Sequence, residues 1–119
     1  MKLIGNVLAL IIASLPLAAS ASDGYKITGR SGLMVFVAVD ATQVANEDVY
    51  RMAVAEACVG KSICQVNYWA TTAPTGLPLN NSQMDSKLVN WQQNQNTGLR
   101  RWLVNCKLSN LFPNNRECM

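Results

Sequence analysis

The spacing of apolar residues changes several times along the chain, and three stretches have the pattern of strands. Residues 33–39 (LMVFVAV) form a continuous apolar run, which is typical of a buried central strand. Residues 63–69 (ICQVNYW) alternate between apolar and polar side chains, as a half-buried strand does. Residues 99–108 (LRRWLVNCKL) alternate as well, with Trp102 and Cys106 on one face. These stretches therefore predict three strands.

Helical spacing predicts two helices between these strands. Asn46 is followed by Glu47 and Asp48, a capping side chain and two first-turn acids that favour a helix start. This first helix should end by Gly60. A second helix is predicted over residues 82–94, capped by residue 81 or 82, because apolar side chains recur there at spacings of four and three. They are Met84, Leu88 and Trp91.

The order of these elements predicts an α+β fold. We expect one small domain with a sheet of three to four strands, two helices and two disulfides. The strand order stays open, because the sequence does not fix which strands are neighbours. Residues 22–32 are polar and contain glycine, so they are interpreted as a loosely strand-forming lead-in. Residues 71–81 (TTAPTGLPLNN) carry two prolines, a glycine and no charge, which predicts a long surface loop.

Residues 1–21 have the pattern of a secretory signal peptide. Lys2 precedes an apolar run over residues 3–17, and small residues close the segment. A retained membrane anchor is the less favoured alternative, because Pro16 interrupts the run and no basic cluster follows it. Cleavage would leave residues 22–119 as the functional domain, periplasmic or secreted and without a membrane span.

The charge balance argues against a nucleic-acid partner. Without the first 21 of its 119 residues the chain keeps 98, and loss of Lys2 leaves nine of ten basic residues against seven acidic ones. A nucleic-acid-binding face needs clustered basic residues, and only Arg100 and Arg101 are adjacent. A chain of this size can build one modest core but not a second domain.

The four cysteines all lie in the predicted domain, at Cys58, Cys64, Cys106 and Cys118. An even number of cysteines in an oxidising compartment predicts two disulfides. Three pairings are possible, and the spacing favours Cys58–Cys64 and Cys106–Cys118 because both close short loops. Zinc is the competing interpretation, but the chain has no histidine and no closely spaced CxxC pair. We therefore expect no metal site.

The absence of histidine also bears on catalysis. Neither a Ser–His nor a Cys–His nucleophile can be built, and cysteines held in disulfides provide no thiolate. The acidic residues show no spacing that brings two of them into one cleft. The chain is therefore interpreted as a non-enzyme without catalytic residues or a cofactor. Two carboxylates about 5–9 Å apart in one cleft would revive an enzymatic hypothesis.

Five residues are candidates for contact with a partner. Trp69 lies on the strand face opposite Cys64 and Tyr68 and leads into the proline-containing loop. If that face is exposed, Trp69 is an anchor, because tryptophan and arginine are enriched in interface hot spots. If a helix covers the face, Trp69 belongs to the core. The five candidates are Trp69, Pro74, Leu77, Arg100 and Arg101.

Part of the chain has a recurring layout. Paired cysteines (CVGKSIC) precede an aromatic-ended strand, and an Asn-Thr-Gly turn precedes Trp102 and Cys106. Over residues 53–106 this layout resembles a group of small exported bacterial proteins. The resemblance implies a periplasmic or secreted bacterial protein and carries no activity. CVGKSIC also resembles the cysteine loop of galactose-binding egg-lectin domains, but the predicted helices disagree with an all-β lectin.

Together these inferences predict a binding module that acts through a protein contact, such as an inhibitor of, or immunity factor against, an envelope-targeting hydrolase. The partner would be another envelope or secreted protein. The alternative is a small carbohydrate-binding module that uses tryptophan stacking and amide hydrogen bonds.

Overall fold

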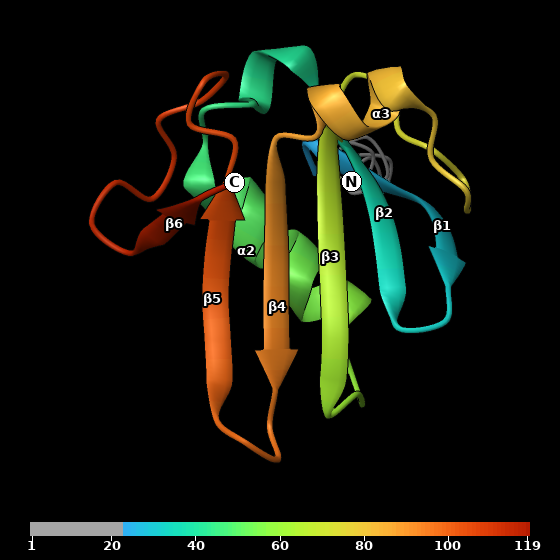
Figure 1. The fold of residues 1–119 in the computed structure, drawn as a ribbon, viewed down its shortest axis with the longest axis vertical. Coiled ribbons are helices and arrows are strands. Elements are labelled where there is room, and N and C mark those ends of the chain that lie inside the picture. The colour runs from blue at the N-terminus through green and yellow to red at the C-terminus, as the bar shows by residue number, and fades with distance from the viewer. Residues whose placement is uncertain (1–22) are drawn as a thin grey trace, which may run out of the picture.

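The structure is a computed structural model that describes residues 23–119, so the predicted signal peptide, residues 1–21, lies outside the described residues. The described chain forms one sheet with the helix α2 (Glu47–Ala57) behind it and the short helix α3 (Asn81–Ser86) at its other side (Figure 1). The α+β class is therefore confirmed. Among residues 23–119, no helix has the length and apolar character needed to cross a membrane.

The sheet has six strands, so the prediction of three to four strands is wrong. The strands are β1 (Tyr25–Ser31), β2 (Met34–Val39), β3 (Ile63–Ala70), β4 (Val89–Asn94), β5 (Leu99–Val104) and β6 (Arg116–Cys118). They lie in chain order across the sheet (Figure 1). The pairs β2–β3 and β5–β6 are parallel, and the other three pairs are antiparallel.

The helix α2 connects the parallel strands β2 and β3 and begins where the sequence predicts. The side chain of Asn46 accepts a hydrogen bond from the backbone N–H of Asp48 at 3.1 Å, and Glu47 and Asp48 occupy the first turn. The helix ends at Ala57, just before Gly60, whose φ of +73° suits a residue without a Cβ.

The main core lies between α2 and the sheet. One face of α2 buries Val49, Tyr50 and Ala53 against alternate residues of the strands. The ring of Tyr50 lies 4.8 Å from that of Tyr68, measured between centroids. Beside α2, Trp102 of β5 extends the core toward β6. Other buried members of this cluster are Val35, Val37, Val39, Val66, Val89, Trp91, Val104, Leu111 and Phe112.

The other face of the sheet is partly covered by the proline-containing loop and α3. Trp69 is 2 % exposed, packs 6.0 Å from Phe36 between ring centroids, and donates its Nε1–H to the backbone oxygen of Gln83 at 2.7 Å. The hydroxyl of Thr28 donates to the backbone oxygen of Pro74 at 2.6 Å, which holds the loop over β1. A second, smaller core therefore forms on this face.

The predicted second helix is wrong beyond Ser86. The helix α3 is capped by Asn80, not by residue 81 or 82, and Asn80 and Gln83 form a capping box. The helix has only 6 residues. Residues 89–94 form the central strand β4 instead, with Val89 and Trp91 facing the main core. The sequence VNWQQN fits both the helical and the strand spacing of apolar residues. Hydrogen bonds to β3 on one side and β5 on the other stabilise the strand.

The two ends of the sheet also differ from the prediction. The lead-in over residues 22–32 contains the strand β1, which pairs with β2 on both sides of a register shift between Ile27 and Gly29. The strand predicted over residues 99–108 ends at Val104, and residues 116–118 return as β6. Three residues are too few for a periodic signal, so β6 depends on tertiary contacts, namely its pairing with β5 and the disulfide of Cys118.

Both favoured disulfides are present. Cys58 is bonded to Cys64 and joins the end of α2 to β3, with 5.7 Å between the Cα atoms. Cys106 is bonded to Cys118 and joins the segment after β5 to the end of β6, with 5.4 Å between the Cα atoms. The described chain has no free cysteine.

Gly29 provides a direct test of how the loop packs. A Cβ atom at this position would lie 2.1 Å from the backbone oxygen of Thr75, whereas a Cβ at Gly76 would meet nothing within 4 Å. We expect Gly29→Ala to lower the free energy of unfolding by about 3 kcal/mol, as overpacking does. It should also displace the loop, so that Trp69 fluorescence shifts to the red. Gly76→Ala is the matched control, and equal stability of the two variants would contradict this packing.

Candidate functional site

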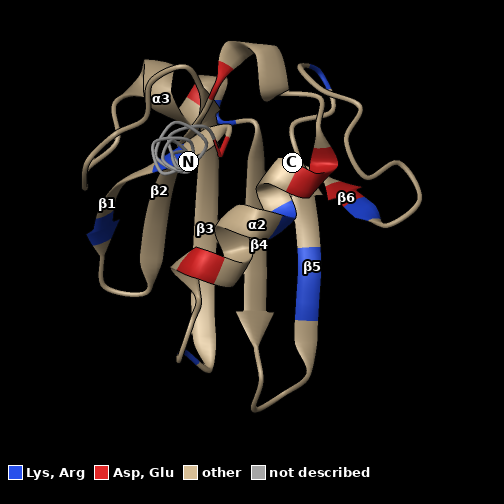
Figure 2. Ribbon diagram, turned by 180° about the vertical axis from the view of Figure 1, so that it is seen from behind, with Lys and Arg blue, Asp and Glu red and all other residues tan. Residues whose placement is uncertain are grey.

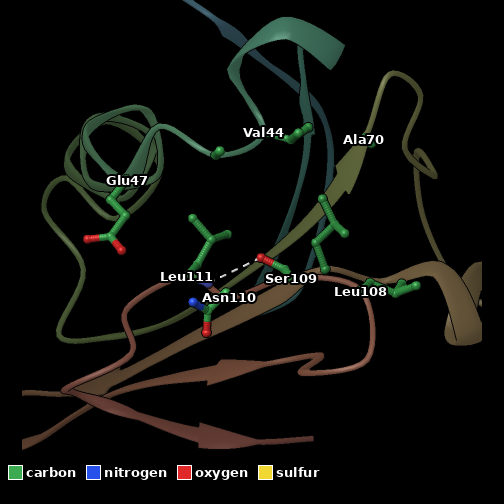
Figure 3. Close-up of a pocket in the computed structure, with 9 residues that line it drawn as sticks. Val44, Glu47, Ala70, Leu108, Ser109, Asn110 and Leu111 are labelled. Atoms are coloured by element: carbon green, nitrogen blue, oxygen red, sulfur yellow. Dashed lines mark hydrogen bonds between the residues drawn. The ribbon is translucent and has the colours of Figure 1, made fainter.

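An apolar pocket opens at the carboxyl end of β3, between the segment that leads into α2 and the segment that follows β5. Its volume is about 310 Å³. Figure 3 shows Val44 and Glu47 on one side of the space and Ser109, Asn110 and Leu111 on the other. We call it the strand-end pocket. It is lined by Val44, Ala45, Glu47, Ala70, Leu88, Leu108, Ser109, Asn110 and Leu111.

Hydrogen bonds fix the walls of the strand-end pocket. The hydroxyl of Tyr50 donates to the backbone oxygen of Val44 at 2.8 Å, which ties one wall to α2. The carboxylate of Glu47 accepts from the backbone N–H of Phe112 at 2.7 Å, which joins α2 to the opposite wall. The carboxylate is thus already engaged, so the site offers a shaped apolar space rather than a free acid.

Two residues with unusual backbone geometry stand beside this pocket. Within residues 23–119 the non-glycine residues with positive φ are Thr71, at 67°, and Phe112, at 50°. Thr71 follows the lining residue Ala70, and Phe112 follows the lining residue Leu111. Such conformations cost about 1–3 kcal/mol each and concentrate at functional sites. The strain therefore singles out this end of the sheet.

A second hollow adjoins the strand-end pocket. It contains Lys87 and Lys107, the chain neighbours of Leu88 and Leu108. Its other lining residues are Met84, Asp85, Asn105 and Met119. The side chain of Leu108 is 54 % exposed, and those of Met84 and Met119 are 53 % and 50 % exposed. Burial lowers the pKa of Lys87 below its usual range. The end of the sheet thus presents exposed apolar side chains beside basic groups. We call the two hollows together the strand-end surface.

Comparisons of the chain with protein-family models, with curated proteins and with solved structures found no match. The geometry of the described residues therefore carries the functional argument.

The five candidates from the sequence do not form one surface. Trp69 is buried beneath α3, so of the two alternatives for its strand face the covered one holds, and Pro74 is buried with it. Leu77 is 51 % exposed in the proline-containing loop. Arg100 lies on the helix-covered face above Trp91, whereas Arg101 lies on the opposite face and pairs with Glu117.

Sequence reasoning missed the residues that line the strand-end pocket. Val44 stands alone in a polar segment, and Leu108 and Leu111 stand in the tail between two cysteines. The available signal is the apolar pair Leu111–Phe112 in an otherwise polar tail. This signal gives no position in space, because the pocket joins segments more than 60 residues apart in the chain.

A pair of acids borders a third hollow, between the start of β1 and the start of α2. Asp23 and Asp40 both line it, and both are exposed to solvent. A general acid at neutral pH needs a carboxyl group that is held away from water, which neither residue provides. No group of three or more metal-ligating side chains occurs within the described residues.

Proposed function

We propose that this domain is an exported binding module that contacts another envelope or secreted protein, in the manner of an inhibitor or immunity factor, through the strand-end surface. The observation that carries the proposal is the apolar strand-end pocket bordered by the strained residues Thr71 and Phe112. Its volume of about 310 Å³ is sufficient for one large apolar side chain of a partner.

The exposed side chains around the pocket support a protein as the occupant. Interface anchors are apolar or aromatic groups set in pockets and surrounded by polar contacts that exclude water. Leu108 and Met84 can supply the apolar contacts, and Lys87 and Lys107 the polar rim. A partner that inserts an apolar side chain and places polar groups against Lys87, Lys107 and Asp85 would match this surface in both respects.

The carbohydrate alternative has less support. Sugar binding by stacking requires an exposed aromatic face, but Trp69, Trp91 and Trp102 are 2 %, 5 % and 6 % exposed. The open part of the sheet face opposite α2 does carry amides, among them Gln65 and Gln92, which pair across β3 and β4. Amides without a ring provide hydrogen bonds but no stacking platform.

Site-specific photo-crosslinking tests the proposal. A photoreactive residue placed at Leu108 in the exported protein should yield one defined protein adduct, identified by mass spectrometry. The same residue at Leu33 should not yield it, because Leu33 is equally exposed, at 53 %, but lies in the turn between β1 and β2. Absence of a specific adduct at Leu108, or the same adduct from both positions, would count against the proposal.

A charged side chain at the pocket should then weaken binding to the purified partner. We expect Leu108→Asp to raise the dissociation constant at least about tenfold, because an anchor contact of this kind contributes about 1.5–3 kcal/mol. Thermal unfolding should be unchanged, since Leu108 is largely exposed. Leu33→Asp is the control variant and should bind as the unaltered protein does.

A further inference from the structure

A separate hollow on the helix-covered face of the sheet is lined by two arginines and two tryptophans. It lies between α2 and the strands β4 and β5 and has a volume of about 310 Å³. Figure 2 shows this side of the sheet, with α2 in front of the strands and the basic stretch of β5 coloured blue. We call this hollow the arginine–tryptophan groove. Its lining residues are Arg51, Val54, Ala55, Trp91, Arg100 and Trp102.

Aromatic rings hold the two guanidinium groups in place. The Cζ atom of Arg100 lies 5.1 Å from the ring centroid of Trp91, and that of Arg51 lies 5.1 Å from the ring centroid of Phe112. Trp102 stands between these rings, 4.6 Å from Trp91 and 4.1 Å from Phe112. Cation–π contacts restrict where a guanidinium can lie. The two charges are therefore pre-organised at the ends of one aromatic cluster.

The charge of Arg100 is not compensated within the described part of the chain. Arg101 pairs with Glu117, and Arg51 pairs with Glu47 and Asp48, but Arg100 forms no ion pair among residues 23–119. The pairs of Arg51 are long, at 3.3 and 3.4 Å, and solvent-exposed, so they contribute little and can be exchanged. The groove thus presents one unpaired and one exchangeable guanidinium beside an apolar floor.

We infer that the arginine–tryptophan groove binds a carboxylate side chain within a short acidic segment of the partner, an inference that rests on the proposed function. A guanidinium presents parallel N–H donors that match the two oxygens of a carboxylate. The apolar stem of the acidic side chain and its neighbours would pack on Val54 and the edges of the indoles. The strand-end pocket thus recognises an apolar side chain of the partner, and the groove recognises one negative charge.

The surrounding charges favour an isolated carboxylate over a continuous polyanion. Glu47 and Asp48 lie beside Arg51, at 3.4 and 3.3 Å from its guanidinium nitrogens. A nucleic acid or an anionic polysaccharide would bring its repeated charges against these acids, and like charges in contact oppose binding. A peptide can place one acid in the groove and neutral residues beside it.

Proton–nitrogen correlation spectra of the exported domain test this inference without the partner. The probes are the capped peptide acetyl-Gly-Leu-Glu-Leu-Gly-amide and the same peptide with glutamine in place of glutamate. We expect the glutamate peptide to shift the indole N–H signals of Trp91 and Trp102, and the glutamine peptide to bind about fivefold more weakly or worse. The indole of Trp69 serves as an internal control, because it lies on the opposite face.

Two variants assign the effect to the groove. Arg100→Gln should weaken binding of the glutamate peptide by about fivefold or more. Arg101→Gln should leave this binding unchanged, because Arg101 lies on the other face of the same strand. An unchanged Trp69 signal in the free variants confirms that each is folded. Polygalacturonate, an anionic polysaccharide, is the third probe.

Equal shifts from the two peptides, or equal losses in the two variants, would overturn the inference. A stronger, Arg100-dependent response to polygalacturonate would overturn the assignment to an acidic peptide. None of these results changes the crosslinking outcome at Leu108, so failure of the groove and failure of the strand-end surface can be told apart.

Discussion

Replacing Trp102 with alanine is expected to lower the free energy of unfolding by about 3–5 kcal/mol, as other large-to-small core substitutions do. Trp102 is 6 % exposed and stacks on Phe112 with an interplanar angle of 8°. Its ring also packs against Trp91 and Tyr68. A domain of this size has a total stability of about 5–15 kcal/mol, so the variant should lose a large part of its stability. Urea denaturation followed by circular dichroism measures the loss.

Leu99 on the same strand is the control for this prediction. It is 39 % exposed at the start of β5, outside the main core. Leu99→Ala should therefore cost about 1 kcal/mol or less. Similar losses for Trp102→Ala and Leu99→Ala would show that the aromatic cluster does not hold β5 to the rest of the core.

Alkaline unfolding is the second large effect that we expect. Burial raises the pKa of Tyr50 and of Tyr68 well above the usual value of 10.0. Both hydroxyls donate hydrogen bonds to backbone oxygens, that of Tyr68 to Tyr50 and that of Tyr50 to Val44. Above pH 10 the unfolded chain releases these two protons while the folded chain keeps them. Stability is therefore constant with respect to these groups below pH 10 and falls as the pH rises above it.

The magnitude follows from the number of protons. Each proton that only the folded chain retains costs about 1.4 kcal/mol per pH unit, so two such tyrosines give a slope of about 3 kcal/mol per pH unit above pH 10. A third tyrosine, Tyr25, adds to the trend, since burial and the carboxylate of Glu56 raise its pKa to about 12. Unfolding by urea at a series of pH values gives the slope.

Phenylalanine variants separate the contributions to alkaline unfolding. The phenylalanine side chain in Tyr68→Phe cannot ionise. The slope of stability against pH above pH 10 should therefore decrease by the contribution of one proton, about 1.4 kcal/mol per pH unit. At neutral pH the same variant should be destabilised by about 1 kcal/mol, because the backbone oxygen of Tyr50 loses its donor. An unchanged slope in both Tyr68→Phe and Tyr50→Phe would contradict the protonated state of these buried hydroxyls.

Local signals were sufficient for the elements whose information lies within a few residues. Asn46 with its two following acids marks the start of α2, and the short spacing from Cys58 to Cys64 marks a disulfide. The strand β4 shows where local signals end. Met84, Leu88 and Trp91 recur at helical spacing, yet Leu88 and Trp91 face the main core from an extended chain. Pairing on both sides of β4 outweighs its weak local preference.

The candidate site was harder to predict than the fold for the same reason. The strand-end pocket joins Val44 before α2, Ala70 at the end of β3 and Leu108 beyond β5. No two of these segments are near one another in the chain, so only the assembled sheet brings them together. The sequence leaves open whether Trp69 is exposed or covered, and the fold decides this, because the loop and α3 fold back over Trp69 and bury it.

The Cys106–Cys118 bond makes formation of the strand-end pocket depend on the redox environment of the chain. Parallel strands usually need a helical crossover, but β5 and β6 are joined by residues 105–115 without one, and β6 pairs through only three residues. The bond joins both ends of this connection, and in the chain-entropy model it disfavours the unfolded chain by about 3 kcal/mol. The same segment forms one wall of the strand-end pocket. Under the proposed function, we therefore expect the reduced chain to bind its partner more weakly than the oxidised chain does.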